Sequence, residues 1–192
     1  MRALTTRTLP VLVLAGASVA MPSTALAASS SGPRTTERPL AAASICSKVS
    51  GAAVSKIIGY KLPNASTYTF TTKATAANFG VAATTTTCTY GVETSMASIL
   101  RAVTLSFETL SKPLTTSQMQ QLVKKDTALA KFVFSPYPGL GAPAFYFTLT
   151  ESGITGQGIS IDKGLHYYGA SVETAKTTKA KVAALASLAE NL

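Results

Sequence analysis

The stretch Ile99-Leu100-Arg101-Ala102-Val103-Thr104-Leu105-Ser106-Phe107 carries the clearest structural signal in this chain. Apart from Arg101, its odd-numbered residues are apolar, whereas its even-numbered residues are mostly small or polar. Alternation with a period of two is typical of a strand that turns one face toward a core. The pattern therefore predicts that Val103, Leu105 and Phe107 are buried.

Other segments rich in β-branched and aromatic residues predict the rest of the sheet. They are residues 67–70 and 84–90 before this strand, and 143–150, 159–162 and 165–172 after it. Residues 73–81 are interpreted as a loop, and Gly153, Gly156 and Gly158 as turn residues before residue 159. Consecutive strands joined by short turns favour an antiparallel meander.

Three helices are predicted from their end signals. Ser50 can cap a short helix that Gly59 closes, and Thr178 can cap a final Ala-rich helix. Thr115 and Gln118 form a capping box for the middle helix, whose apolar spacing continues to Val133. The order of elements predicts an α+β domain, with three helices against a mainly antiparallel sheet of about five to six strands.

The N-terminus has the three parts of a secretory signal peptide. Arg2 and Arg7 precede an almost entirely apolar run over residues 9–21, and Ala25-Leu26-Ala27 offers a small-residue cleavage site. The run is shorter than the roughly 20 residues that span a bilayer, and no cysteine follows it for lipid attachment. We expect residues 1–27 to be the signal peptide, 28–43 a flexible tail and 44–192 a single domain, secreted or held in the cell envelope without a membrane anchor.

Cys46 and Cys88 are the two cysteines of the chain. Export would place them in an oxidising compartment, where two thiols in a small domain usually pair. A redox pair usually has the spacing Cys-x-x-Cys, and a metal site needs more ligands than two cysteines and one histidine. The sequence therefore predicts one structural disulfide and no metal or cofactor site.

The chain is basic. Removing Arg2 and Arg7 from the 17 basic residues leaves 15 against eight acids, a net charge of +7 for the mature part. The low content of charged residues and the abundance of Ala and Thr are typical of exported proteins of high-GC bacteria. Since the basic residues are scattered and not interleaved with aromatics, we expect a solvated lysine surface and no nucleic-acid partner.

The residues that carry chemistry give no enzyme signature. The single histidine, His166, lies four residues after Asp162, but no nucleophile elbow accompanies them. A glycosidase needs two positioned carboxylates. The eight acids are dispersed along the chain, and whether Glu93, Glu108 or Glu151 converge in space depends on the fold. Aromatic residues offer a candidate ligand groove instead, although core packing would explain them equally. They are Phe145, Phe147, Tyr167 and Tyr168.

A set of packing motifs resembles a known group of proteins. The set comprises a helix that follows a cysteine and ends in Ile-Gly (46–59), a Cys-x-Tyr strand (88–90), a Gly-Leu-Gly loop before an aromatic strand (139–147), and a closing Ala-rich helix. It resembles small exported or lipid-anchored actinobacterial proteins of unknown function, whose fold is similar to the extracellular sensor domain of mycobacterial receptor Ser/Thr kinases. The resemblance implies a disulfide between the first helix and the sheet, a ligand groove and no catalytic residues.

From these observations we expect a monomeric, non-enzymatic binding or sensor-like domain that acts at the cell envelope or outside the cell. Its partner would be an unknown small molecule or envelope component. Two alternatives stay open. One is a structural protein that contacts a polyanion of the cell wall, and the other is an envelope-acting hydrolase that uses Asp162 and His166.

Overall fold

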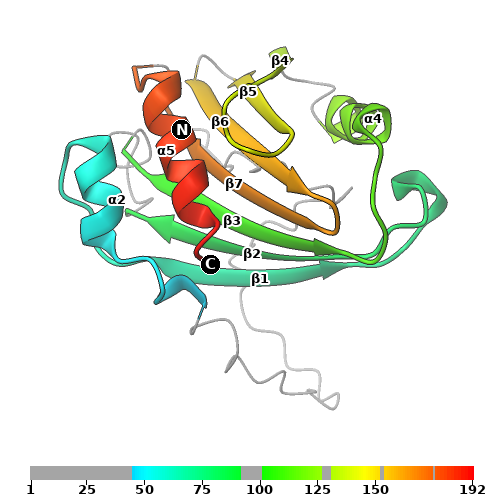
Figure 1. The fold of residues 1–192 in the computed structure, drawn as a ribbon, viewed down its shortest axis with the longest axis horizontal. Coiled ribbons are helices and arrows are strands. Elements are labelled where there is room, and N and C mark those ends of the chain that lie inside the picture. The colour runs from blue at the N-terminus through cyan, green and yellow to red at the C-terminus, as the bar shows by residue number, and fades with distance from the viewer. Residues whose placement is uncertain (1–44, 92–100, 127–130, 152–153, 175) are drawn as a thin grey trace, which may run out of the picture.

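The strands of the chain assemble into one antiparallel sheet with helices on both of its faces (Figure 1). The computed structural model describes residues 45–91, 101–126, 131–151, 154–174 and 176–192, so the expected signal peptide and tail lie outside it. The elements are α2 (Gly51–Ile58), β1 (Ser66–Thr72), the 3-10 helix η1 (Ala76–Asn78), β2 (Ala83–Tyr90), β3 (Val103–Leu110), α4 (Thr116–Asp126), β4 (Lys131–Pro136), β5 (Ala144–Glu151), β6 (Ile154–Lys163), β7 (His166–Val172) and α5 (Lys179–Ala189).

The predicted α+β class is confirmed, but the sheet has seven strands instead of five to six. Their order is β1-β2-β3-β7-β6-β5-β4, and each neighbouring pair is antiparallel. The additional strand is β4, which lies partly where the middle helix was predicted to continue to Val133. The helical spacing was misleading there, since the segment Lys-Phe-Val-Phe has strong strand propensity and pairs with β5.

Strand β6 is also longer than predicted. Gly156 and Gly158 were interpreted as turn residues, yet both lie inside β6 and are buried. A Cβ atom at Gly158 would lie 2.2 Å from the Phe147 ring. The glycine is thus required by the close approach of an aromatic side chain from β5 and not by a turn.

The predicted caps at Ser50, Gly59 and Thr115 are confirmed by their hydrogen bonds. The backbone N–H of Ala53 donates to the Ser50 side chain, and Gly59 closes α2 with a φ of 95°. At the start of α4, Thr115 and Gln118 bond reciprocally between side chain and backbone. These signals act within a few residues, so they do not depend on tertiary contacts.

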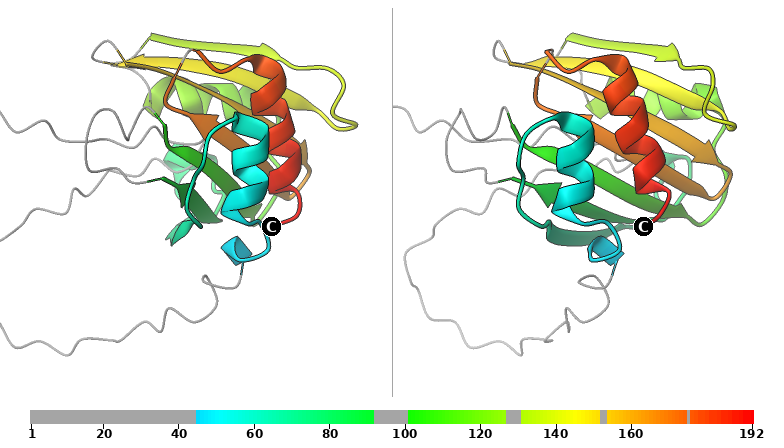
Figure 2. Two further views of the ribbon diagram at one scale, coloured as in Figure 1. Left: turned by 90° about the vertical axis from the view of Figure 1, so that its left-hand side faces the viewer. Right: turned by 60° about the vertical axis from the view of Figure 1, so that its left-hand side comes forward.

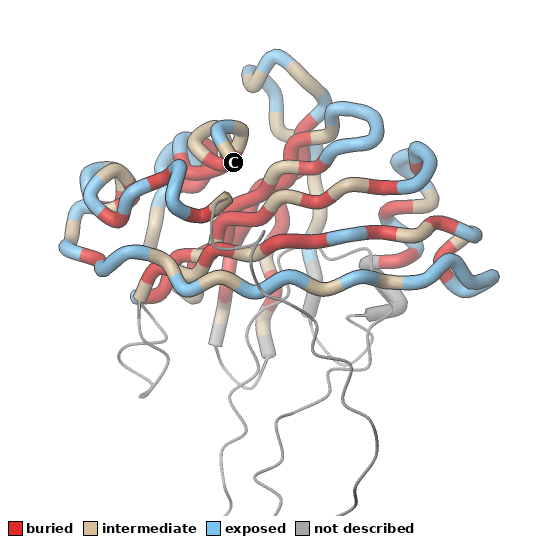
Figure 3. Tube along the Cα trace, turned by 90° about the horizontal axis from the view of Figure 1, so that it is seen from below, coloured by how far each residue is buried: buried red, intermediate tan, exposed pale blue. Residues whose placement is uncertain are grey.

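The helices cover opposite faces of the sheet at opposite ends of its strands (Figure 2). Helices α2 and α5 lie on the face that carries Cys88, Leu105, Ala170 and Ile159. Helix α4 lies on the other face, where Met119 and Leu122 pack against apolar residues that include Leu110. Each face of the sheet is therefore partly covered by helices. Figure 3 shows the buried central strands and the exposed edge strand β1.

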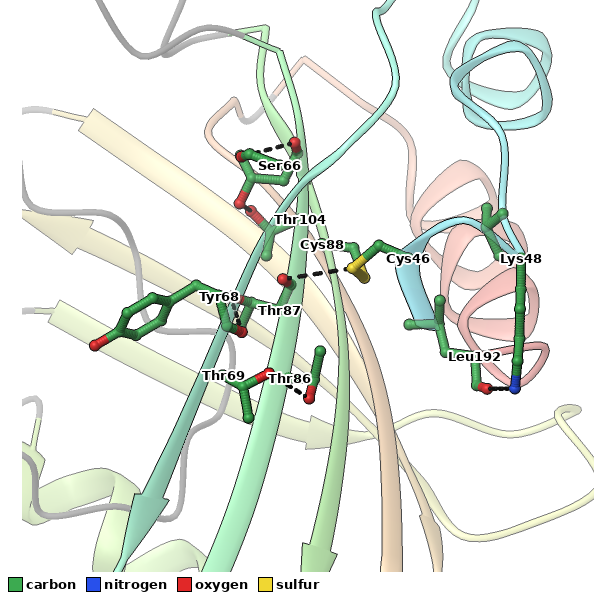
Figure 4. The surroundings of a disulfide bond; sticks show 12 residues. Cys46, Lys48, Ser66, Tyr68, Thr69, Thr86, Thr87, Cys88, Thr104 and Leu192 are labelled. Atoms are coloured by element: carbon green, nitrogen blue, oxygen red, sulfur yellow. Dashed lines mark hydrogen bonds between the residues drawn. A yellow bond between two sulfur atoms is a disulfide. The ribbon is translucent and has the colours of Figure 1, made fainter. Parts of the chain in front are cut away.

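The disulfide predicted from the sequence joins Cys46 to Cys88, with their Cα atoms 5.5 Å apart (Figure 4). Cys88 is fully buried in β2, and Cys46 lies just before α2. Nearby, the Lys48 ammonium donates to the backbone oxygen of Leu192 at 2.6 Å. The segment just before α2 is thus attached both to the sheet and to Leu192.

In the described ranges, every helix is too short or too polar to cross a bilayer.

Candidate functional site

The aromatic residues predicted to line a ligand groove do not share one face of the sheet. Phe145, Phe147 and Tyr167 are buried on the α4 face together with Met119. Tyr168 lies on the opposite face and is half-buried, because consecutive residues of a strand point in opposite directions. Ligand contact by any of the four aromatic residues stays a prediction.

Asp162 and His166 are also separated by the sheet. Asp162 pairs with Tyr167 on the α4 face, whereas His166 pairs with Lys163 on the other face. The Asp162 carboxylate accepts a hydrogen bond from the backbone N–H of Gly164 at 2.8 Å, and the His166 ring lies 3.3 Å from the Thr109 hydroxyl. The two side chains thus have separate partners, and the contact that a catalytic pair would need is not formed.

The tertiary structure instead gathers three rings on the α2–α5 face, beyond the end of the helices. Phe107 of β3 lies next to Tyr168 and His166 of β7, with ring centroids 5.3 and 5.7 Å away, respectively. Phe107 and Tyr168 are half-buried, while His166 is exposed. The strands β3 and β7 are neighbours in the sheet but far apart in the sequence, so only the fold brings these rings together.

A ladder of threonine side chains continues this surface toward the edge of the sheet. The strand pairing places Thr86 and Thr69 in the row of Phe107, and Thr84 and Thr71 in the row of Thr109. The hydroxyls of Thr69 and Thr86 are 2.9 Å apart. We call this surface the open half-face. It comprises Thr69, Thr71, Thr84, Phe107, Thr109, His166 and Tyr168, whereas Thr86 is only 4% exposed.

An ion pair marks the border between the open half-face and the helices. The Lys163 ammonium lies 3.0 Å from the Glu190 carboxylate at the end of α5. The same ammonium lies 5.6 Å from the centre of the Tyr168 ring. Tyr168 is therefore held between a neighbouring ring and a cation, which restricts the movement of its side chain.

A row of polar side chains crosses the α4 face. The strand pairing places Thr85, Glu108, Tyr167 and Asp162 side by side in four successive strands. The Thr85 hydroxyl donates to Glu108 at 3.0 Å, and Glu108 is only 2% exposed. Burial raises the pKa of Tyr167, and the charges of Asp162 and Glu108 raise it further.

In this polar row, two carboxyl side chains flank the buried hydroxyl of Tyr167. From the sequence, Glu108 and Asp162 were named separately and were not placed together. Their strands, β3 and β6, lie on either side of β7 only in the folded sheet. Glu93 lies outside the described residues. Since Glu108 is buried, we interpret the row as a buried polar network beneath α4, and the open half-face as the accessible candidate site.

Comparison of the chain with protein-family models and with curated proteins gave no match. The candidate site is therefore interpreted from its own geometry. Within the described part of the chain, no three or more His, Cys, Asp or Glu side chains gather in a way that could hold a metal ion.

One signal in the sequence could have identified the open half-face. Phe107 and Tyr168 each continue an alternating apolar pattern beyond the residues that the helices cover, and the strand before Cys88 is a run of four threonines, 84–87. Rings and hydroxyls at the same end of neighbouring strands indicate a surface and not a core. The order of the strands is also needed, because it shows that these strand ends are neighbours in the sheet.

Proposed function

We propose that the chain is an exported, non-enzymatic binding or sensor-like domain, and that it binds its ligand on the open half-face. The ligand would be a component of the cell envelope or a small molecule that presents a flat ring. The signal-peptide pattern of residues 1–27 supports export, and a disulfide is compatible with an oxidising compartment.

The observation that carries this proposal is the group of three neighbouring rings, Phe107, Tyr168 and His166. They lie on a sheet surface that the described helices leave uncovered. Aromatic side chains supply a large, rigid contact area for a small loss of conformational entropy. The adjoining threonine hydroxyls can donate and accept hydrogen bonds. This combination suits a ligand that has an apolar ring face and polar groups at its edge.

The scaffold supports binding because it holds the rings in place before a ligand arrives. Phe107 lies two residues beyond Leu105, which is fully buried beneath the helices. Tyr168 lies two residues before Ala170, which is also fully buried. Each ring is therefore anchored in a strand whose other half belongs to the core, which lowers the entropy lost on binding.

A thermal-shift screen of envelope glycans, lipids and small metabolites tests the proposal. A ligand of the open half-face should raise the melting temperature of the wild-type chain, and the double variant Phe107→Ala/Tyr168→Ala should lose most of this shift. Tyr68→Ala is the matched control, because Tyr68 is 66% exposed and lies in edge strand β1, on the other face of the sheet.

The proposal fails if every ligand that shifts the wild-type chain shifts the double variant equally, or if the control variant loses the shift instead. Hydrolysis of a ligand during the screen would overturn its non-enzymatic part. Replacing His166 by Ala then shows whether turnover depends on this residue, as the alternative of a hydrolase requires.

A further inference from the structure

We propose that a second site, made of four positive side chains around the C-terminal end of α2, binds a flexible envelope polymer whose charge is carried by phosphodiester groups. The four residues are Lys56, Lys61, Arg101 and Lys181, and we call them the basic rim. They lie at the opposite end of the strands from the open half-face. The two sites are separate, so binding at one does not rest on binding at the other, and the two proposals share only the premise of export.

Contacts from three distant parts of the chain assemble the basic rim. Lys56 and Lys61 line a shallow hollow together with Gly59 and Tyr60. The Arg101 guanidinium lies 4.7 Å from the centre of the Tyr60 ring, and the Tyr60 hydroxyl donates to the backbone oxygen of Arg101 at 2.9 Å.

The fourth member comes from α5. The Lys181 ammonium donates to the backbone oxygen of Ile58 at 2.8 Å, in the last turn of α2. Added to Gly59, a Cβ atom would lie 3.3 Å from the same ammonium. Lys181 therefore fixes α5 against the end of α2 and also adds its charge to the hollow.

The positive charge of the basic rim is not neutralised within the described part of the chain. All four side chains are exposed, and none forms an ion pair with a described acidic residue. The surrounding segment, residues 45–91, has four lysines and no acidic residue. The C-terminal pole of a helix supplies only about half a negative charge. The rim therefore keeps a surplus of positive charge that an anion from outside can neutralise.

The surroundings of the rim favour a phosphodiester polymer over a membrane or a nucleic acid. The large hydrophobic side chains exposed in the described residues are Tyr68, Val133 and Leu165, and none of them lines the hollow to enter a bilayer. Arg101 lies over the Tyr60 ring, so this ring is not available for base stacking. A lysine binds phosphate as a point charge and imposes no fixed geometry. It can therefore bind a flexible chain whose geometry changes.

Fluorescence anisotropy with a labelled poly(glycerol phosphate) oligomer tests this site in the chain that begins at Ala28. With three to four phosphate contacts, affinity should fall about 20–50-fold between 50 and 200 mM salt. The variant Lys56→Gln/Lys61→Gln should bind about tenfold more weakly at 50 mM salt and show a shallower salt dependence. Lys181 and Arg101 are left unchanged, since both also make structural contacts.

The matched control is Lys73→Gln/Lys112→Gln, which removes the same charge from two exposed residues at the other end of the strands. This control should change affinity less than twofold, and the melting temperatures of both variants should equal that of the wild type. An equal loss in the control would overturn the site, because general charge would then explain binding.

Equal or tighter binding to phosphatidylglycerol vesicles, single-stranded DNA or alginate would overturn the assigned ligand. Phe107→Ala/Tyr168→Ala should leave this binding unchanged, whatever its effect on the open half-face.

Discussion

Two neighbouring rows of side chains on the α2–α5 face differ at their centre, where one is fully buried and the other is only half-buried. The first row contains Cys88, Leu105, Ala170 and Ile159, and all four are fully buried beneath the helices. Each residue of the second row lies two positions away in its strand, and this row contains Thr86, Phe107, Tyr168 and Ile161. Phe107 and Tyr168 at its centre are half-buried, whereas Thr86 and Ile161 at its ends are buried.

The difference at Phe107 and Tyr168 follows from how far the helices extend over the sheet. Ala170 has a small side chain, which lets α5 approach β7 closely. Tyr168 and Phe107 are large, and they are only half-buried although their strands are as regular there as beneath the helices. Phe107 was predicted to be buried but is only half-buried, so this prediction was wrong. Val103 and Leu105 are fully buried as predicted. Apolar alternation in a strand thus predicts a face but does not predict how much of that face is covered.

The largest effect is expected from removing the disulfide, which belongs to the covered row. Replacing both Cys46 and Cys88 by Ser should lower the free energy of unfolding by about 4 kcal/mol, given the sequence separation of 42 between the cysteines. Chemical denaturation of the wild type and the variant measures this loss.

The variant without the disulfide also tests whether the two rows are independent. Ligand binding at the open half-face should survive under native conditions, because Phe107 and Tyr168 are held by the pairing of β3 with β7. If binding is lost while the variant is still folded, the two rows are coupled.

A pair of alanine variants in one strand compares the two rows directly. Leu105→Ala should lower the free energy of unfolding by about 2–5 kcal/mol, since it leaves a cavity beneath the helices. Phe107→Ala should lower it by about 1 kcal/mol, because the ring is already partly in contact with water. Urea denaturation of both variants measures the difference, and equal losses would contradict the existence of an open half-face.

The pH dependence of stability tests Tyr90, which is fully buried in the covered half and donates to the backbone oxygen of Val49 at 2.9 Å. Burial raises the pKa of Tyr90 to about 12. Since an unfolded tyrosine titrates near pH 10, the unfolded state loses its proton first, and stability should fall by roughly 2 kcal/mol between pH 10 and pH 12.

Comparison with phenylalanine variants isolates this contribution. Tyr90→Phe should be less stable than the wild type at pH 8, because its hydrogen bond is lost, but its stability should decrease less steeply above pH 10. Tyr68→Phe, at an exposed position, should keep the pH dependence of the wild type. An identical slope for Tyr90→Phe and the wild type would show that water reaches the covered half.

The sequence alone determined the features that depend on neighbouring residues. The caps at Ser50, Thr115 and Thr178, and the left-handed Gly59, follow from hydrogen bonds within one helical turn. The two cysteines sufficed to predict their pairing, because no other thiol is present. The α+β class followed from the order of strand and helix patterns, although β4 was taken for the continuation of a helix.

Only the tertiary structure decided which residues meet. The alternation of a strand assigns each side chain to one of two faces, but the neighbours on that face depend on the order of the strands. Phe107 and Tyr168 are adjacent because β3 lies beside β7, and this pairing joins segments separated by β4, β5 and β6 in the sequence. The extent of α2 and α5 then decides which rows are buried. Both candidate sites thus arise from long-range packing, which local patterns of residues do not contain.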